Sequence, residues 1–265
     1  MFVKCMTVAA IAAAAGTSSA QVKVYNVSTD ALSNGQPHLG LLGEIHDSGG
    51  YEGFAVGPVD GQFGYTIFGG GDTNAVSIDT ANPAGGNQHL RVANDAQASP
   101  GTLRGAFTPT AADVADPIIT MSVDVSIGAT GGADYDVVPQ APTQGFLSAR
   151  VKFNFLGNIF ILDDTGGGLS FIDTGIAWTV GSYENLTIEM DRSAGTLDYY
   201  YGGSHIYSSV SGIFAGTAFE QVVLLSDNFN AGEVGDFDNL TVSIPAPASL
   251  ALLGLGGLAA TRRRR

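Results

Sequence analysis

The sequence is poor in cysteine and in positive charge. Its only cysteine, Cys5, precedes the apolar run 8–15, so it is not placed to carry a lipid, and no disulfide can form within the chain. Lysine and arginine number 11 against 25 aspartates and glutamates. Lys4 and the four arginines 262–265 are 5 of those 11, which leaves 6 basic against 25 acidic residues between them, a net charge of −19. A body of that charge repels phosphate backbones, which argues against a nucleic-acid partner.

Signatures of catalysis are missing as well. No nucleophile elbow, phosphate loop or dinucleotide fingerprint occurs. The four histidines are scattered, and His46-Asp47 has no second histidine at ligand spacing, which argues against zinc. The nearest approach to a paired-carboxylate glycosidase motif is Glu189-Met190-Asp191, which runs into a turn. We interpret it as a strand end with solvated carboxylates and predict no catalytic residues.

The N-terminal segment has the pattern of an export signal. Lys4 precedes the apolar run 8–15, and small residues at 16–20 suit cleavage after Ala20. We therefore expect a signal peptide over 1–20, one domain over 21–243 and a separate tail over 244–265.

The body alternates apolar and polar residues, as half-buried strands do. Residues 118–127 place five apolar side chains on one face, and similar runs cover 145–155, 158–162 and 183–190. Glycine-rich turns separate them, and the clearest hairpins join 186–191 to 196–201 and then, through Gly202-Gly203, to 205–208. Many short strands without strand–helix alternation predict an all-β antiparallel sandwich of the jelly-roll type.

The tail combines a proline break, an apolar segment and a basic end. Residues 246–260 would span about 22 Å as a helix, short of the ~30 Å hydrocarbon core. The basic cluster, which should stay cytoplasmic, consists of Arg262, Arg263, Arg264 and Arg265.

This order of parts resembles the PEP-CTERM sorting signal of bacterial surface proteins. Pro245-Ala246-Pro247 stands where that family has Pro-Glu-Pro, so the chain departs from the pattern at Ala246. The resemblance implies transient insertion in the inner membrane, cleavage by an exosortase-like transpeptidase, and delivery to the cell envelope, cell surface or extracellular matrix. An ordinary C-terminal membrane anchor is the alternative.

The body resembles the concanavalin A-like, or laminin-G-like, jelly roll. The segments that carry the resemblance are 51–54, 61–62, 87–92, 183–191 and 236–242. It implies carbohydrate binding and a structural calcium shared by Glu52 and Asp238. The segment 227–233, which precedes Asp238, is rich in side-chain oxygens, as a calcium loop would be. The alternative is that it forms a solvated turn with no bound ion.

An aromatic platform is expected at 199–201. Three consecutive tyrosines on one strand must divide between its faces, so Tyr200 should point away from Tyr199 and Tyr201. Trp178 is expected in the core. We predict a non-enzymatic polysaccharide-binding or structural module with Tyr200 at its ligand site; a polysaccharide-degrading jelly-roll enzyme is the alternative.

Overall fold

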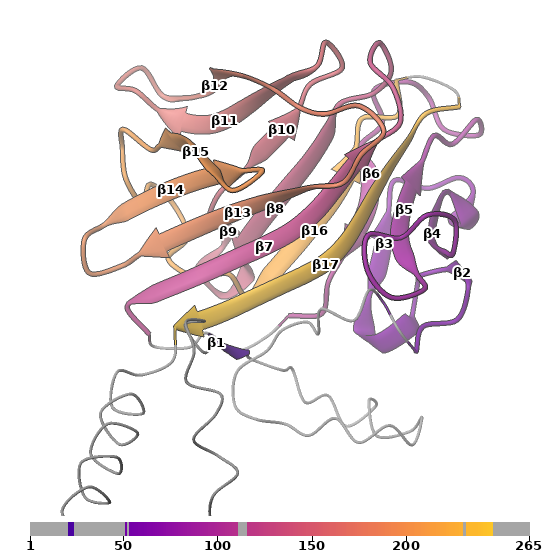
Figure 1. Ribbon diagram of the computed structural model, residues 1–265, viewed down its shortest axis with the longest axis horizontal. Coiled ribbons are helices and arrows are strands. Elements are labelled where there is room, and N and C mark those ends of the chain that lie inside the picture. The colour runs from indigo at the N-terminus through magenta and orange to yellow at the C-terminus, as the bar shows by residue number, and fades with distance from the viewer. Residues whose placement is uncertain (1–20, 24–50, 52, 111–115, 230–231, 246–265) are drawn as a thin grey trace, which may run out of the picture.

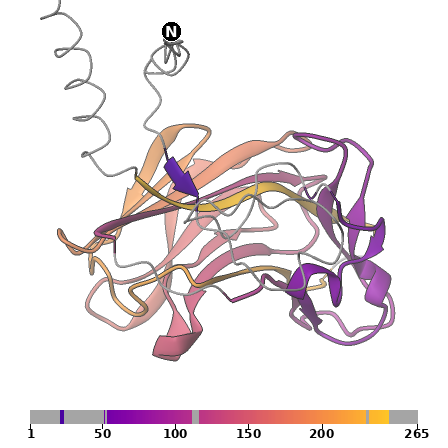
Figure 2. The same ribbon diagram turned by 90° about the horizontal axis from the view of Figure 1, so that it is seen from below.

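The computed structural model describes residues 21–23, 51, 53–110, 116–229 and 232–245, which form two antiparallel sheets packed face to face (Figures 1 and 2). The nine-stranded sheet contains β15 (Ser204–Ser208), β14 (Thr196–Tyr201), β13 (Glu184–Asp191), β7 (Ile118–Ile127), β17 (Val234–Pro245), β5 (His89–Ala93), β4 (Val76–Asp79) and β2 (Gly57–Pro58) in this spatial order, and β1 (Gln21–Lys23) pairs with the end of β17.

The eight-stranded sheet lies opposite. It contains β12 (Leu169–Ala177), β11 (Asn158–Asp164), β10 (Val151–Phe153), β8 (Tyr135–Ala141), β16 (Gln221–Ser226), β6 (Arg104–Phe107) and β3 (Thr66–Phe68) in spatial order, and β9 (Phe146–Leu147) pairs with β8. The only helices among the described residues are single 3₁₀ turns, η2 (Gln62–Gly64), η3 (Thr73–Ala75) and η4 (Pro142–Gln144), so no helix there is long and apolar enough to cross a membrane. The predicted all-β sandwich is confirmed.

The core fills the space between the two sheets because each strand alternates. On β7 the five predicted apolar residues are buried, and they are Ile119, Met121, Val123, Val125 and Ile127. The eight-stranded sheet packs against them with its own buried residues, which are Val137, Val151, Phe153, Ile159, Ile161, Val222 and Leu224. Trp178 also lies in this core, as predicted.

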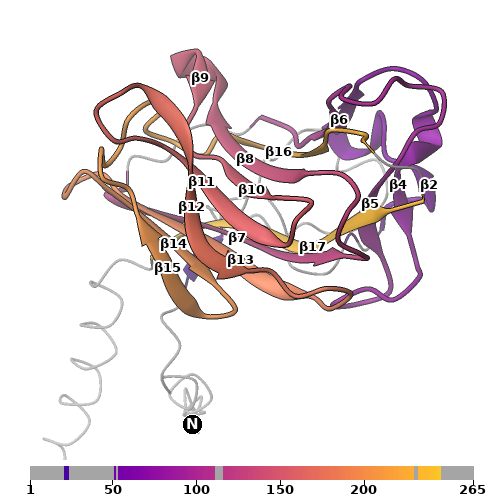
Figure 3. The same ribbon diagram turned by 90° about the horizontal axis from the view of Figure 1, so that it is seen from above.

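The long strands β7 and β17 run side by side at the middle of the nine-stranded sheet (Figures 1 and 3). Their register shifts between Asp238 and Thr241, and Asn239 adopts a positive φ of 49°. Two consecutive residues, Asp238 and Asn239, therefore lie between the core residues Phe237 and Leu240 at this bulge.

One predicted run is divided. Residues 145–155 form two short strands, β9 and β10, because the intervening Ser148 and Ala149 both donate their N–H groups to the carbonyl of Pro139, at 2.9 and 3.2 Å. Pro139 has no N–H to return to the ladder, so regular pairing stops there. The last strand is also longer than the expected domain limit, since β17 includes Ile244 and Pro245.

Candidate functional site

The outer surface of the nine-stranded sheet is polar over several adjacent strands. Since the apolar residues of β7, β13 and β14 point into the core, their alternate residues point outward and remain partly exposed. We call this surface the polar face; it is formed by Ser122, Asp124, Asn185, Thr187, Glu189, Asp198, Tyr200, His205 and Ser208.

Tyr200 occupies the middle of the polar face. Tyr199 and Tyr201 are 0% and 8% exposed in the core, so the predicted division of the three tyrosines is confirmed. Tyr200 pairs with Thr187 of β13 on one side and His205 of β15 on the other. Its ring meets that of His205 edge-on, with centroids 5.3 Å apart. Burial, together with the carboxylates of Glu189 and Asp198, raises the pKa of Tyr200.

A hydrogen-bond chain fixes the polar side chains beside Tyr200. Thr187 Oγ1 donates to Asn185 Oδ1 at 2.7 Å, and Asn185 Nδ2 donates to Asp124 Oδ1 at 2.7 Å and to Ser122 Oγ at 2.9 Å. Asn239, on the bulge of β17, donates to the other Asp124 oxygen at 2.7 Å. The groups are therefore oriented before any ligand arrives.

A second polar group borders Tyr200 on the edge strand. Ser208 Oγ donates to Asp198 Oδ1, and His205 Nε2 lies 2.9 Å from the same hydroxyl. Sequence reasoning did not include His205 in the site. The Gly202-Gly203 hairpin could have identified it, because pairing across that turn places His205 opposite Tyr200.

The two carboxylates that the sequence analysis weighed for catalysis are Glu189 and Asp191, on β13. Asp191 ends β13 and accepts from Ser193 N, Ser193 Oγ and Ala194 N at 2.6–2.9 Å, which is the turn expected from the sequence. Glu189 points outward beside Tyr200 and is partly exposed.

Two further carboxylates lie two residues apart on β17. Arg91 Nε donates to Asp236 Oδ1 at 2.8 Å, and His89 Nε2 lies 3.1 Å from the same oxygen. Burial alone would raise the pKa of Asp236, but these two partners hold it below its usual value. Burial raises the pKa of Asp238, against the opposing effect of backbone N–H donors.

Asp238 is the described member of the predicted calcium pair. It is 0% exposed; its Oδ2 accepts from Ala84 N at 2.7 Å and Gly85 N at 2.9 Å, and its Oδ1 from Asn239 N at 2.8 Å. Glu52 lies outside the described residues. Calcium requires several oxygen ligands, whereas the groups around Asp238 are N–H donors, and the described part of the chain holds no cluster of three or more acidic, histidine or cysteine ligands. Structural calcium at Glu52 and Asp238 therefore stays a prediction.

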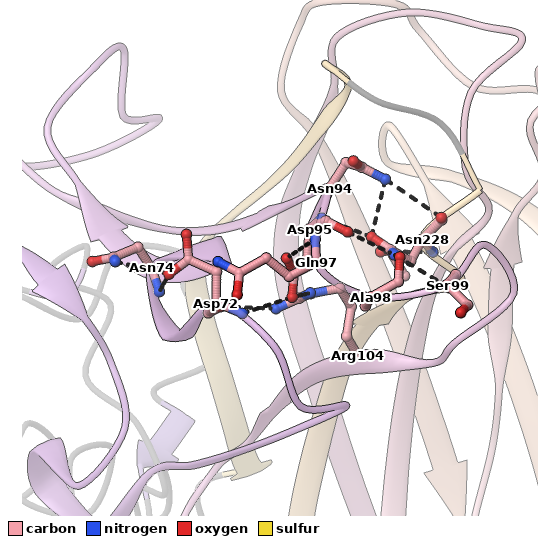
Figure 4. A network of polar contacts seen from close by, with 10 residues as sticks. Asp72, Asn74, Asn94, Asp95, Gln97, Ala98, Ser99, Arg104 and Asn228 are labelled. Carbon is pink, nitrogen blue, oxygen red and sulfur yellow. Dashed lines mark hydrogen bonds and ion pairs between the residues drawn. The ribbon is translucent and has the colours of Figure 1, made fainter.

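Asn228, in the oxygen-rich stretch 227–233, is bonded to residues 95–99, as Figure 4 shows. Asn228 Oδ1 accepts from Asp95 N at 2.7 Å, and its Nδ2 donates to the carbonyls of Asp95, Ala98 and Ser99 at 3.1–3.4 Å. Asp95 also forms a buried ion pair with Arg104. A buried charge is tolerated when an opposite charge and hydrogen bonds compensate for its lost hydration, as they do for Asp95. The network joins the 95–104 loop to Asn228, which follows β16. The sequence analysis did not predict this structural role for Asn228.

The two predicted terminal signals lie mostly outside the described part of the chain. Residues 1–20 and 246–265 are not described, so Ala246, Pro247 and the arginines 262–265 have no structural account. Pro245 is the last residue of β17 and pairs with Gln21 of β1.

Comparison with known proteins gives structural likeness only. No family model and no curated protein matches the chain. A sialidase is similar over 76% of this chain and 19% of its own length, at 11% identity and a TM-score of 0.48. The botulinum neurotoxin type G receptor binding domain is similar over 71% of this chain and 46% of its own, at 12% identity and a TM-score of 0.44. The catalytic domain of a glycoside hydrolase family 131 protein from Coprinopsis cinerea is similar over 69% of this chain and 84% of its own, at 14% identity and a TM-score of 0.48. The chain thus spans about a fifth of the sialidase and about half of the neurotoxin domain, and at such identities the likeness concerns fold alone.

Proposed function

We propose that this protein is an exported, non-enzymatic module that binds extracellular polysaccharide through the polar face around Tyr200. The observation that carries the proposal is the placement of one partly exposed tyrosine ring among oriented hydroxyl, amide and carboxylate groups on a rigid sheet. A sugar ring presents an apolar C–H side, which an aromatic ring can cover, and hydroxyl groups at its edge, which such polar groups can bind.

The site is held ready for binding. Tyr200 is fixed between two paired strands, and the network from Thr187 to Asp124 leaves few rotamers open. Little side-chain entropy is then lost when a ligand binds, so modest contacts suffice for useful affinity.

Affinity electrophoresis of the full-length protein in gels containing different bacterial and algal polysaccharides tests the proposal, with and without calcium. Retardation that is lost in Tyr200→Ala, without released reducing sugar, supports a binding module. Phe171→Ala is a matched control, because this ring lies on β12 of the other sheet, against Arg150 and Lys152. Loss of retardation on chelation would bring Glu52 and Asp238 into the ligand site. No retardation on any polymer would contradict the proposal and favour a purely structural matrix role.

A polysaccharide-degrading enzyme is the second candidate. Two carboxylates whose pKa values are displaced in opposite directions, as for Asp236 and Asp238, are the pattern of an acid and base pair. The burial of Asp238 and its three N–H donors argue for loop anchoring instead. Reducing sugar released at an enzymatic rate and abolished in Asp236→Asn would favour the enzyme; release that survives Glu189→Gln and Asp191→Asn would remove those two carboxylates from consideration.

We also propose that the tail directs export through an exosortase-like transpeptidase, with transient residence in the inner membrane. The proposal rests on the order Pro245-Ala246-Pro247, apolar segment, Arg262 to Arg265. Expression in a bacterial host with an exosortase, followed by mass spectrometry of the exported chain, should give a C-terminus near 245–247. An intact tail on the exported protein would contradict cleavage and favour the ordinary anchor.

A further inference from the structure

Two carboxylates lie opposite each other beside Tyr200 on the polar face. Glu189 of β13 and Asp198 of β14 are register partners, and both side chains are partly exposed. Thr187 and Tyr200 form the next outward-facing pair along the same two strands, which are neighbours at one edge of the sheet (Figure 1). Successive outward-facing pairs are about 7 Å apart. The two carboxylates therefore border the tyrosine ring along one side.

This pair of like charges is not compensated by a lysine or arginine. Ser208 Oγ donates to Asp198 Oδ1, and His205 Nε2 lies 3.5 Å from the same oxygen. Glu189 makes no hydrogen bond or ion pair with any residue that the structure describes. Like charges directly opposite each other destabilise an antiparallel pair of strands. A contribution to the stability of the fold therefore does not explain why Glu189 faces Asp198.

Asp124, the third carboxylate of the polar face, is bonded within the chain. Its two oxygens accept from Asn185 Nδ2 and from Asn239 Nδ2, each at 2.7 Å. Glu189 instead keeps both oxygens available at a partly exposed position. An ionised carboxylate accepts hydrogen bonds more strongly than a neutral group does. Glu189 can thus accept from adjacent hydroxyl groups at the edge of a sugar that lies on Tyr200.

The same two carboxylates oppose a sugar that carries negative charge. Two like charges about 4 Å apart weaken an association about fivefold even in bulk water, and more strongly at a protein surface. Arg91, which β5 contributes to this sheet, is already paired with Asp79 and Asp236. The body as a whole carries a net charge of −19, so it adds to the repulsion.

We infer that the polar face selects uncharged polysaccharides, with Glu189 and Asp198 as the residues that reject acidic ones. The inference rests on the proposed polysaccharide function and names its ligand class: a polymer of neutral sugars with adjacent free hydroxyl groups, as opposed to a polymer of uronates or sulfated sugars. Glu189 acts in two ways, since it accepts from the hydroxyl groups of a neutral sugar and repels an anionic one.

The test compares two polymers with the same backbone. The neutral polysaccharide with primary hydroxyl groups that most retards the full-length protein is oxidised at those groups to carboxylates. Calorimetry gives the dissociation constants of both forms at low salt and near-neutral pH, with a chelator present so that no divalent cation bridges two carboxylates. We expect the oxidised form to bind at least about tenfold more weakly. Added salt should narrow this difference.

Glu189→Gln should narrow the ratio of the two dissociation constants at least about threefold, because the amide neither repels the oxidised polymer nor binds hydroxyl groups as strongly. Asp173→Asn is the matched control. It also removes one negative charge, but Asp173 is exposed on β12 of the other sheet, so the ratio should stay within about twofold of the wild type. Equal narrowing in both variants would overturn the role of Glu189, since the repulsion would then belong to the whole acidic body.

The stability of Glu189→Gln gives a second readout. The variant should fold, with a urea midpoint at or above that of the wild type, because it removes one of two opposed charges. A clearly lower midpoint would mean that Glu189 stabilises the fold, and it would overturn the inference.

Acidic polymers that bind the wild type as tightly as neutral ones would also overturn it, as would an unchanged ratio in folded Glu189→Gln. If Tyr200→Ala still abolishes retardation in that case, the proposed function stands and only the selection against acidic glycans falls. If no polymer retards the wild type, both fall together.

Discussion

Tyr207 of β15 donates its hydroxyl to Asp163 Oδ2 of β11 at 2.8 Å, so a side chain of one sheet is bonded to a carboxylate of the other. Asp163 also accepts from Ser209 Oγ and Ser211 Oγ and, at 2.7 Å, from Val210 N. One buried carboxylate thereby fixes the edge strand that carries His205 and the loop that follows it.

Asp163→Ala should lower the free energy of unfolding by about 3 kcal/mol, because it leaves four part-buried donors without their acceptor. Urea unfolding followed by tyrosine fluorescence measures this. Asp173→Ala on exposed β12 should stay within about 0.5 kcal/mol of the wild type. Similar stability for the two variants would contradict the role of Asp163.

The same carboxylate gives a pH dependence. Burial would raise the pKa of Asp163, but its four donors outweigh that effect and lower the pKa to about 2. A depressed folded pKa stabilises the protein above the unfolded value near 4, and that contribution is lost as pH falls from about 4 to about 2. Urea midpoints of the wild type should therefore drop faster over this range than those of Asp163→Asn. Parallel curves would refute the assignment.

Asn228 should be hard to replace. Its φ is 55°, and its side chain bonds both backbone groups of Asp95. Asn228→Asp removes the Nδ2 donor and places a second carboxylate beside Asp95, so we expect a loss of about 3 kcal/mol. Hydrogen exchange should accelerate at the Asp95 and Ala98 amides first. Unchanged protection at both would show that Asn228 does not hold the loop.

Two glycines make a matched pair. A Cβ at Gly105 would lie 2.0 Å from the Leu224 carbonyl oxygen, where β6 approaches β16, whereas a Cβ at Gly167 meets nothing within 4 Å. Gly105→Ala should cost at least about 3 kcal/mol or prevent folding, while Gly167→Ala should be neutral or slightly stabilising. The melting temperatures of both variants test this prediction. A Gly105→Ala variant as stable as the wild type would contradict it, because it would mean that β6 and β16 can move apart to admit the Cβ.

The alternation of apolar and polar residues was sufficient to predict the strands that have one solvent-exposed face. The alternation of 118–127 and the glycine turns after Asp191 and Tyr201 correctly predicted β7 and the β13–β14–β15 hairpins. The position of Tyr200 followed from the same period of two.

Strands buried on both sides were harder to find. Val222, Val223, Leu224 and Leu225 of β16 are all buried, because Val223 and Leu225 pack on the outer side with Phe68 and Phe107, so no alternation marks the strand. The partners of Asp163 and Asn228 are up to 133 residues away in the chain and could not be inferred from local spacing.

The most direct test of the central claim is the dissociation constant of Tyr200→Ala for the polysaccharide that most retards the wild type, measured beside Phe171→Ala. Removing the ring should weaken binding about tenfold and leave the urea midpoint unchanged, because Tyr200 lies outside the core. Phe171→Ala, on the other sheet, should bind like the wild type. Wild-type affinity in folded Tyr200→Ala would contradict the account, since the polar face would then not be where the glycan binds.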